Sequence, residues 1–109
     1  MVERAGGRVE PQFGLTAEAL ELICGVFRLH PEVDAVKVFG SRAAEQFENG
    51  SDVDLALWGD VDLQLLGRIA RELDELPLPY TFDVKMYDAI GHEPLRRDID
   101  QGGKILYGR

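Results

Sequence analysis

The sequence predicts an α+β domain in which helices pack against a small mixed β-sheet. Three observations indicate this class: a length of only 109 residues, apolar stripes at helical spacing, and short segments in which apolar and polar residues alternate. The segments follow in the order helix, strand, strand, helix, strand, helix. A chain of this length has no room for a second core, so we expect one domain.

The first helix is predicted to begin after Thr16, a residue type favoured at N-caps, and to end before Pro31. Its apolar stripe is formed by Leu20, Ile23 and Phe27. Residues 1–14 contain three glycines and a proline without apolar periodicity, and we interpret them as a flexible lead-in to a single domain spanning residues 15–109.

Three further segments are predicted to be strands: residues 35–39, 52–58 and 80–87. The first is short and β-branched and stops at Gly40, and the second alternates strictly between polar and apolar residues. A polar segment, residues 41–51, separates these two strands and has room for one helical turn at its start.

The second helix is predicted to start at Asp60 as its cap and to close before Pro77. Its apolar face is formed by Leu63, Leu66, Ala70 and Leu73. The last helix is predicted to begin at Glu93 and to end at the glycine pair 102–103, with Leu95 and Ile99 facing inward.

Charge and composition exclude several function classes. With 12 basic and 20 acidic residues the formal net charge is −8, which disfavours unassisted binding to DNA or RNA. No apolar run approaches the roughly 20 residues of a membrane helix, and the N-terminus lacks a signal-peptide pattern. Cys24 is the only cysteine, which excludes an internal disulfide and a cysteine-cluster metal site and is typical of a cytoplasmic protein.

Acidic residues alternate with apolar ones in two of the predicted strands. In the strand 52–58 the apolar residues face the core, so Asp52 and Asp54 stand side by side on the opposite face. If the strand 80–87 is its neighbour, Asp83 joins them. Carboxylates this close repel one another unless a cation lies between them. Three carboxylates could hold two Mg²⁺ ions, the arrangement used in nucleotidyl transfer.

The segment Gly40-Ser41-Arg42 is a candidate phosphate-binding turn. Glycine lets a phosphate approach the backbone, and free N–H groups at the start of a helical turn attract anions. Ser41 adds a hydroxyl donor, and Arg42 adds a guanidinium that matches phosphate oxygens. We therefore predict that this turn binds the polyphosphate of a nucleotide.

Each pattern alone has a common structural explanation. An Asp-x-Asp pair is most often a solvated strand edge, and a Gly-Ser pair is most often only a turn. Lys85 projects with Asp83 and is predicted either to neutralise the acids or to contact phosphate. We interpret the combination as functional because five fixed positions rarely coincide by chance. These positions are Gly40, Ser41, Ser51, Asp52 and Asp54.

The motifs resemble those of the minimal nucleotidyltransferases (MNT type) of the DNA polymerase β superfamily. The resemblance rests on residues 38–43, 50–55 and 82–84 and extends from about Thr16 to Tyr107. It implies the nucleotidyltransferase fold, also described as the polymerase β palm, and an Mg²⁺-dependent enzyme with ATP as its substrate.

The resemblance also implies roles for individual residues. Asp52 and Asp54 would coordinate both Mg²⁺ ions and the nucleotide phosphates, and Asp83 would bind the catalytic metal and help to deprotonate the attacking hydroxyl. Gly40 and Ser41 would hold the β- and γ-phosphates. Arg42 and Ser51 are counted with them as nucleotide-binding residues.

By the same resemblance, the reaction moves a nucleoside monophosphate, most often AMP from ATP, onto a hydroxyl and releases pyrophosphate. Many similar proteins are antitoxins of HEPN/MNT pairs that adenylylate a tyrosine of their toxin, so the expected partner and acceptor is a HEPN-type helical protein. The acidic chain is compatible with a basic protein partner. Two alternatives remain open: a non-catalytic antitoxin that acts by binding, and transfer to a small molecule such as an aminoglycoside.

Overall fold

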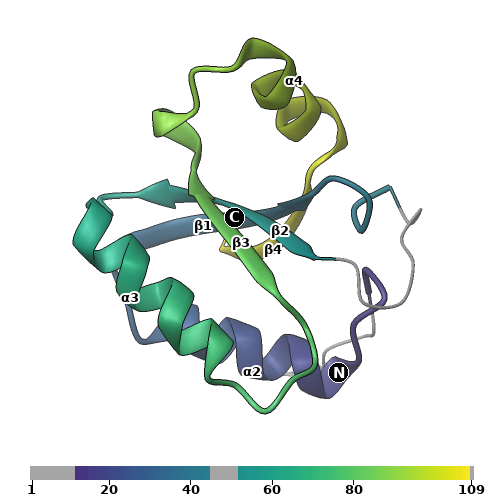
Figure 1. Ribbon diagram of the computed structural model, residues 1–109, viewed down its shortest axis with the longest axis vertical. Coiled ribbons are helices and arrows are strands. Elements are labelled where there is room, and N and C mark those ends of the chain that lie inside the picture. The colour runs from purple at the N-terminus through teal and green to yellow at the C-terminus, as the bar shows by residue number, and fades with distance from the viewer. Residues whose placement is uncertain (1–11, 45–51, 109) are drawn as a thin grey trace.

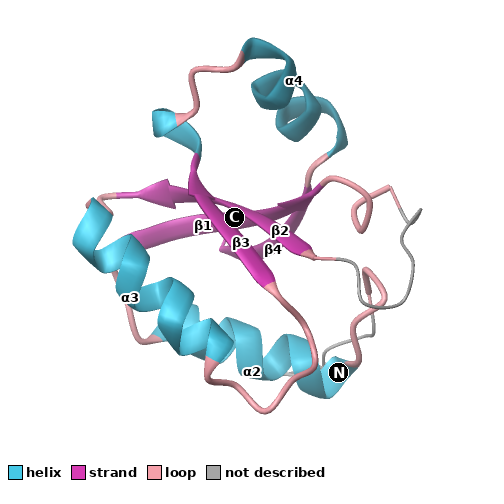
Figure 2. Cartoon of the chain, viewed as in Figure 1, coloured by secondary structure: helices cyan, strands magenta, loops and turns pink. Residues whose placement is uncertain are grey.

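The computed structural model describes residues 12–44 and 52–108 (Figure 1, Figure 2). In chain order the described elements are α2 (Ala17–Arg28), β1 (Val33–Phe39), β2 (Val53–Gly59), α3 (Leu63–Asp74), β3 (Phe82–Met86), the 3-10 helix η1 (Tyr87–Ala89), α4 (Glu93–Gly102) and β4 (Lys104–Gly108). The predicted α+β class with a small mixed sheet is confirmed.

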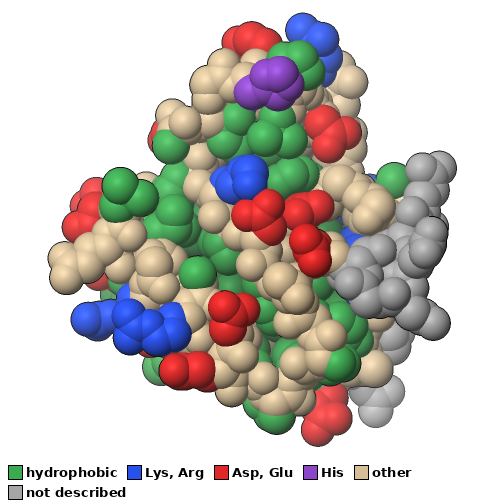
Figure 3. Space-filling view, in the orientation of Figure 1, with side chains coloured by type: hydrophobic (Ala, Val, Ile, Leu, Met, Phe, Trp, Pro, Cys, Tyr) green, Lys and Arg blue, Asp and Glu red, His purple; other side chains and the backbone are tan. Residues whose placement is uncertain are grey.

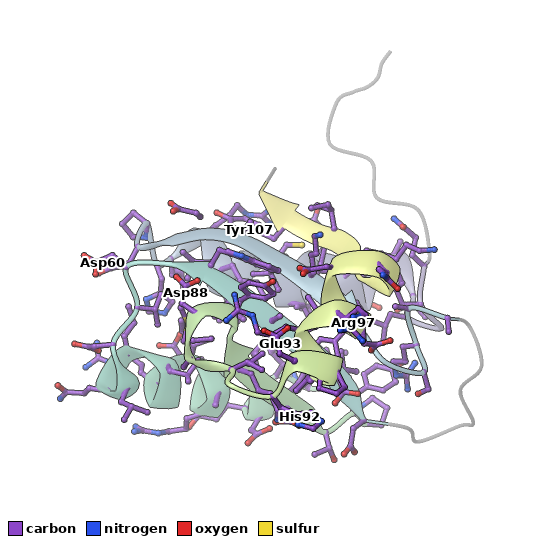
Figure 4. The ribbon with its side chains drawn as sticks, turned by 90° about the horizontal axis from the view of Figure 1, so that it is seen from above. Asp60, Asp88, His92, Glu93, Arg97 and Tyr107 are labelled. Carbon is purple, nitrogen blue, oxygen red and sulfur yellow. The ribbon has the colours of Figure 1, made fainter. Side chains whose placement is uncertain are left out.

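The strands form one sheet in the order β3-β2-β1-β4. β1 is antiparallel to both of its neighbours, whereas β2 and β3 are parallel. Parallel neighbours require a crossover connection, and α3 supplies it. β3 and β4 are therefore the two edges of the sheet. Seen from above in Figure 4, Tyr107 of β4 lies at one edge, and His92, which follows β3 and η1, lies at the other.

Helices cover the two faces of the sheet unequally. α2 and α3 lie on one face, and α4 lies on the other (Figure 1). The main core contains Ile23 and Phe27 of α2, Ile69 and Leu73 of α3, and Val36, Val38, Val53, Leu55 and Leu57 of the sheet. A smaller core under α4 contains Phe39, Ala56, Ile90 and Ile99. The apolar face predicted for the second strand is thus confirmed.

The helix starts follow local capping chemistry. Oγ1 of Thr16 accepts a hydrogen bond from the N–H of Ala19 at 3.0 Å, as predicted for the first helix. The cap of α3 is Asp62, which accepts from the N–H of Leu65 at 2.8 Å, and the prediction of Asp60 was wrong by two residues. Leu63 is consequently the first residue of the helix and is 84% exposed instead of facing the core. None of the described helices has the length and apolar character needed to cross a membrane.

Two further segments differ from the prediction. Gln12 and Leu15 are joined by two backbone hydrogen bonds, and Phe13 packs into the main core, so the lead-in predicted for residues 1–14 is wrong for residues 12–14. Residues 1–11 lie outside the described part of the chain. β4 was not predicted as a strand, because its five residues, the last of them a glycine, give little periodicity to detect.

Candidate active site

The parallel pairing of β2 and β3 brings two of the predicted acids together. Asp54 lies directly opposite Asp83, so the two side chains project from the same face of neighbouring strands. Asp52 is exposed and immediately precedes β2. Figure 3, which views the molecule from the β3 edge of the sheet, shows a group of acidic side chains near the middle with a basic side chain beside it. The condition that the two strands are neighbours is therefore met.

The acids repel one another and are partly balanced by a lysine. Burial raises the pKa of the Asp54 carboxyl above its ordinary value, the charges of Asp83 and Asp52 raise it further, and Lys85 acts in the opposite direction. Nζ of Lys85 lies 2.8 Å from Oδ2 of Asp83, in a pair whose side chains are 38% and 48% exposed. Of the two roles predicted for Lys85, neutralisation of the acids is the one observed.

Gly40 places the turn after β1 against Asp54. Phe39, the last residue of β1, is paired with Asp54, and Gly40 follows with a φ of +76°, a backbone conformation that suits glycine. A Cβ atom at Gly40 would lie only 2.7 Å from Oδ2 of Asp54. Glycine suits this position because of its backbone conformation, and a side chain here would force the Asp54 carboxylate to shift.

The remaining residues of the predicted phosphate turn are placed as follows. Residues 41–44 form a turn in which the N–H of Ala44 donates to the carbonyl of Gly40 at 3.2 Å, so the expected helical turn is present over these residues. Ser41 is exposed and directly follows Gly40, which leaves its hydroxyl accessible to a ligand. Ser51, also predicted to bind the nucleotide, lies outside the described residues.

Arg42 is placed differently from the prediction. Its side chain is only 2% exposed, Nη1 donates to the carbonyl of Phe13 at 2.8 Å, and the guanidinium lies 5.1 Å from the centre of the Tyr80 ring. The hydrogen bond joins the turn after β1 to a residue near the start of the chain, and the ring contact joins it to the segment before β3. The prediction that Arg42 contacts phosphate is therefore not supported, because its guanidinium is buried in the fold.

An aromatic network that the sequence did not predict lies farther along the same face. Trp58 stacks on Tyr87 at 4.7 Å between ring centres, and Arg96 of α4 lies 4.7 Å from the Tyr87 ring. The hydroxyl of Tyr87 donates to Asp100 of α4 at 2.7 Å. The network joins α4 to the sheet. The sequence feature that could have predicted this network is the alternation of side chains along the two strands. It puts Trp58 on the same face as Asp54, and Tyr87 on the same face as Asp83.

The acids match the donor chemistry of Mg²⁺. This ion prefers carboxylate oxygens and water. Burial and, after it, the charges of Asp83 and Asp52 raise the pKa of Asp54, and a bound cation would relieve the repulsion between these charges. Within residues 12–44 and 52–108, no three acidic, histidine or cysteine side chains stand close enough together to form a finished metal site. The donors fit the ion in kind, and binding would have to draw Asp52, Asp54 and Asp83 closer together.

Residues 21–109 match the family described as polymerase beta, nucleotidyltransferase. Because the match covers most of the chain, this protein belongs to that family of enzymes. The enzyme class predicted from the Gly-Ser and Asp-x-Asp motifs, nucleotidyltransferase, is thereby confirmed. No curated protein matches the sequence significantly.

Several solved structures share the fold. A toxin–antitoxin structure with AMP-PNP aligns with a TM-score of 0.69 and 22% identity over 83% of this chain and 73% of that chain. A complex of tri-AMPylated HEPN toxin with MNT antitoxin from Shewanella oneidensis aligns with a TM-score of 0.64 and 21% identity over 84% and 71% of the respective chains. The toxin–antitoxin MntA–HepT structure gives 0.64 and 21% over 84% and 72%. The predicted resemblance to MNT proteins is confirmed as a likeness of fold.

Proposed function

We propose that this chain transfers AMP from ATP to a hydroxyl group of a partner protein. The observation that carries the proposal is the register of β2 and β3, which places Asp54 opposite Asp83 in a chain of the nucleotidyltransferase family. Asp52 and Gly40 complete the candidate site, because Asp52 adds to the repulsion at Asp54 and Gly40 approaches its carboxylate closely.

The acids and the turn have separate roles in the proposed reaction. The acceptor oxygen bonds to the α-phosphorus of ATP, the bond to the pyrophosphate oxygen breaks, and Asp83 takes up the proton of the hydroxyl. Gly40 and Ser41 hold the β- and γ-phosphates through the backbone and the exposed hydroxyl, and Ser51 is proposed to assist them. Arg42 is left out of this set because it is buried.

Asp52, Asp54 and Asp83 are the residues that would hold Mg²⁺, two ions in the full site. When bound, Mg²⁺ neutralises the charge of the phosphates during transfer. Without it, the three carboxylates and a triphosphate would repel one another, because the described basic side chain beside the acids, Lys85, is already paired with Asp83.

The proposed acceptor is a HEPN-type toxin, which makes this chain the antitoxin of a pair. Two structures with the same fold support this: a toxin–antitoxin with AMP-PNP, and a tri-AMPylated HEPN toxin in complex with its MNT antitoxin. The net charge of −8 favours a protein acceptor with a basic surface and disfavours nucleic acid.

The test is label transfer from ATP radiolabelled at the α-phosphate to a purified HEPN-type toxin in the presence of Mg²⁺. We expect transfer by the native chain, loss of transfer in Asp54→Asn and Asp83→Asn, and native transfer in Asp74→Asn, an exposed acid at the end of α3. The absence of label on the toxin would count against catalysis. Transfer retained by both site variants would reject the site, and full neutralisation of the toxin by inactive variants would identify a non-catalytic antitoxin.

A further inference from the structure

Two adjoining hollows flank the outer edge of β3, next to Asp83. One, of about 360 Å³, lies between α3, β3 and the segment that leads into α4, and the other, of about 320 Å³, continues past the end of β3. Both hollows are lined by Leu66, Met86 and Ala89, so they adjoin each other. We call the two hollows together the β3 groove. Its side chains are apolar apart from Lys85, Asp88 and His92, and Figure 4 shows His92 on the β3 side of the molecule.

The floor of the β3 groove is an open strand edge. The carbonyl of Thr81 accepts from the N–H of Val53, so the backbone groups of Asp83 and Lys85, at the same alternation, face β2. The backbone N–H and C=O groups of Val84 and Met86 then point away from β2, toward the open edge. Among the described residues, no backbone hydrogen bond from another segment reaches these groups. An extended polypeptide satisfies such groups by adding a strand.

We propose that the β3 groove binds an extended segment of the protein partner as an additional strand beside β3, with the acceptor residue opposite Asp83. The inference rests on the proposed function, because it names how the acceptor reaches that site. Neighbouring strands lie about 4.8 Å apart, so a residue paired with Asp83 projects from the acidic face beside its carboxylate. The residues on either side of the acceptor point to the other face, toward Leu66 and Met86.

Charge and chemistry define the segment. The acids Asp54 and Asp83 lie beside the groove, and the chain carries a net charge of −8, so basic residues near the acceptor are attracted. A second copy of this acidic chain and a nucleic acid are both repelled. The apolar lining suits aliphatic residues on either side of the acceptor. The expected segment is therefore an acceptor with a hydroxyl group between aliphatic and basic residues in extended conformation.

The binding test uses a fluorescein-labelled octapeptide that carries one tyrosine between valines and arginines, without nucleotide or Mg²⁺. We expect saturable binding, and at least tenfold weaker binding in Leu63→Arg and Ala89→Arg, two exposed positions of the groove. Leu29→Arg makes the same change at a site 71% exposed and outside the groove, and should stay within twofold of native. A peptide with proline in place of the flanking valines should bind at least tenfold more weakly, because proline cannot complete the strand ladder.

Several outcomes would overturn the inference. They are no binding up to about 1 mM peptide, equal binding by the groove variants, or equal binding of the proline peptide. A loss of ATP affinity in the groove variants would assign the groove to the nucleotide, and a change from dimer to monomer in sedimentation would make it a contact between copies. A peptide that binds but is never labelled would support the groove and contradict the proposed function. Labelling of the toxin at the native level by the groove variants would support the proposed function and contradict the groove.

Discussion

Replacement of Gly40 by alanine tests the fold and the site together. At a φ of +76° an alanine costs about 1–2 kcal/mol relative to glycine. Its Cβ would lie 2.7 Å from Oδ2 of Asp54, so that carboxylate must rotate away, which adds about 0.5–1 kcal/mol. We expect a loss of about 2 kcal/mol in the free energy of unfolding, or roughly 8–12 °C in Tm. We also expect AMP transfer by the folded protein to fall about 100-fold, because Asp54 is displaced.

The assay is thermal denaturation paired with label transfer at a temperature where both proteins are folded. Gly67→Ala is the matched control, because this glycine lies in α3 with no atom within 4 Å of an added Cβ. Alanine there should raise stability by about 0.5–1 kcal/mol and leave transfer unchanged. A Tm of Gly40→Ala within about 2 °C of native would refute the strain argument. Lower stability with full transfer would refute the role given to Asp54.

Three further predictions concern single side chains. Without metal, Asp54→Asn should raise Tm at neutral pH, because burial and the charges of Asp83 and Asp52 raise the pKa of the Asp54 carboxyl. The charge of Asp54 therefore destabilises the fold above that pKa and not at acidic pH. Mg²⁺ should stabilise only the native chain, as scanning calorimetry can check. Arg42→Ala should lower the free energy of unfolding by about 2–4 kcal/mol in urea titrations without changing the nucleotide affinity of the folded chain, because it leaves the Phe13 carbonyl unpaired. Burial raises the pKa of the Cys24 thiol, so at pH 8 iodoacetamide should modify the folded chain about tenfold more slowly than the unfolded chain, and equal rates would contradict this.

The alternation of polar and apolar residues predicted the part of the site that depends on local geometry. Val53, Leu55 and Leu57 are fully buried, so Asp54 is necessarily on the other face of β2. The sequence could not predict that β2 and β3 are neighbours, and the placement of Asp83 was therefore conditional on it. Strand order depends on contacts between segments that are distant in the sequence. The β3 groove was beyond prediction for the same reason, because α3, β3 and the start of α4 line it together.

Arg42 shows why residue type alone misled the prediction. An arginine after a Gly-Ser turn has the chemistry of a phosphate ligand, but its hydrogen-bond partner here is a carbonyl 29 residues earlier in the chain. That carbonyl belongs to Phe13, in a segment whose glycines and proline suggested no fixed structure. The Phe13 ring is buried in the core, and its backbone carbonyl is buried with it. A buried carbonyl must be paired, and the arginine pairs it.

The burial of Arg42 changes how the charge of a triphosphate would be balanced. Because the Arg42 guanidinium is buried against the Phe13 carbonyl, Gly40 and Ser41 offer a phosphate only neutral hydrogen-bond donors. Neutral donors orient a phosphate but add less to its binding affinity than a charged donor does. Lys85 is held by Asp83, and its release would leave the acids more repulsive toward a nucleotide. In the proposed reaction, the compensating charge would come from Mg²⁺ held by Asp52, Asp54 and Asp83. Nucleotide binding and metal binding would then be coupled, with the ion pair between Lys85 and Asp83 partly balancing the acids when no metal is bound.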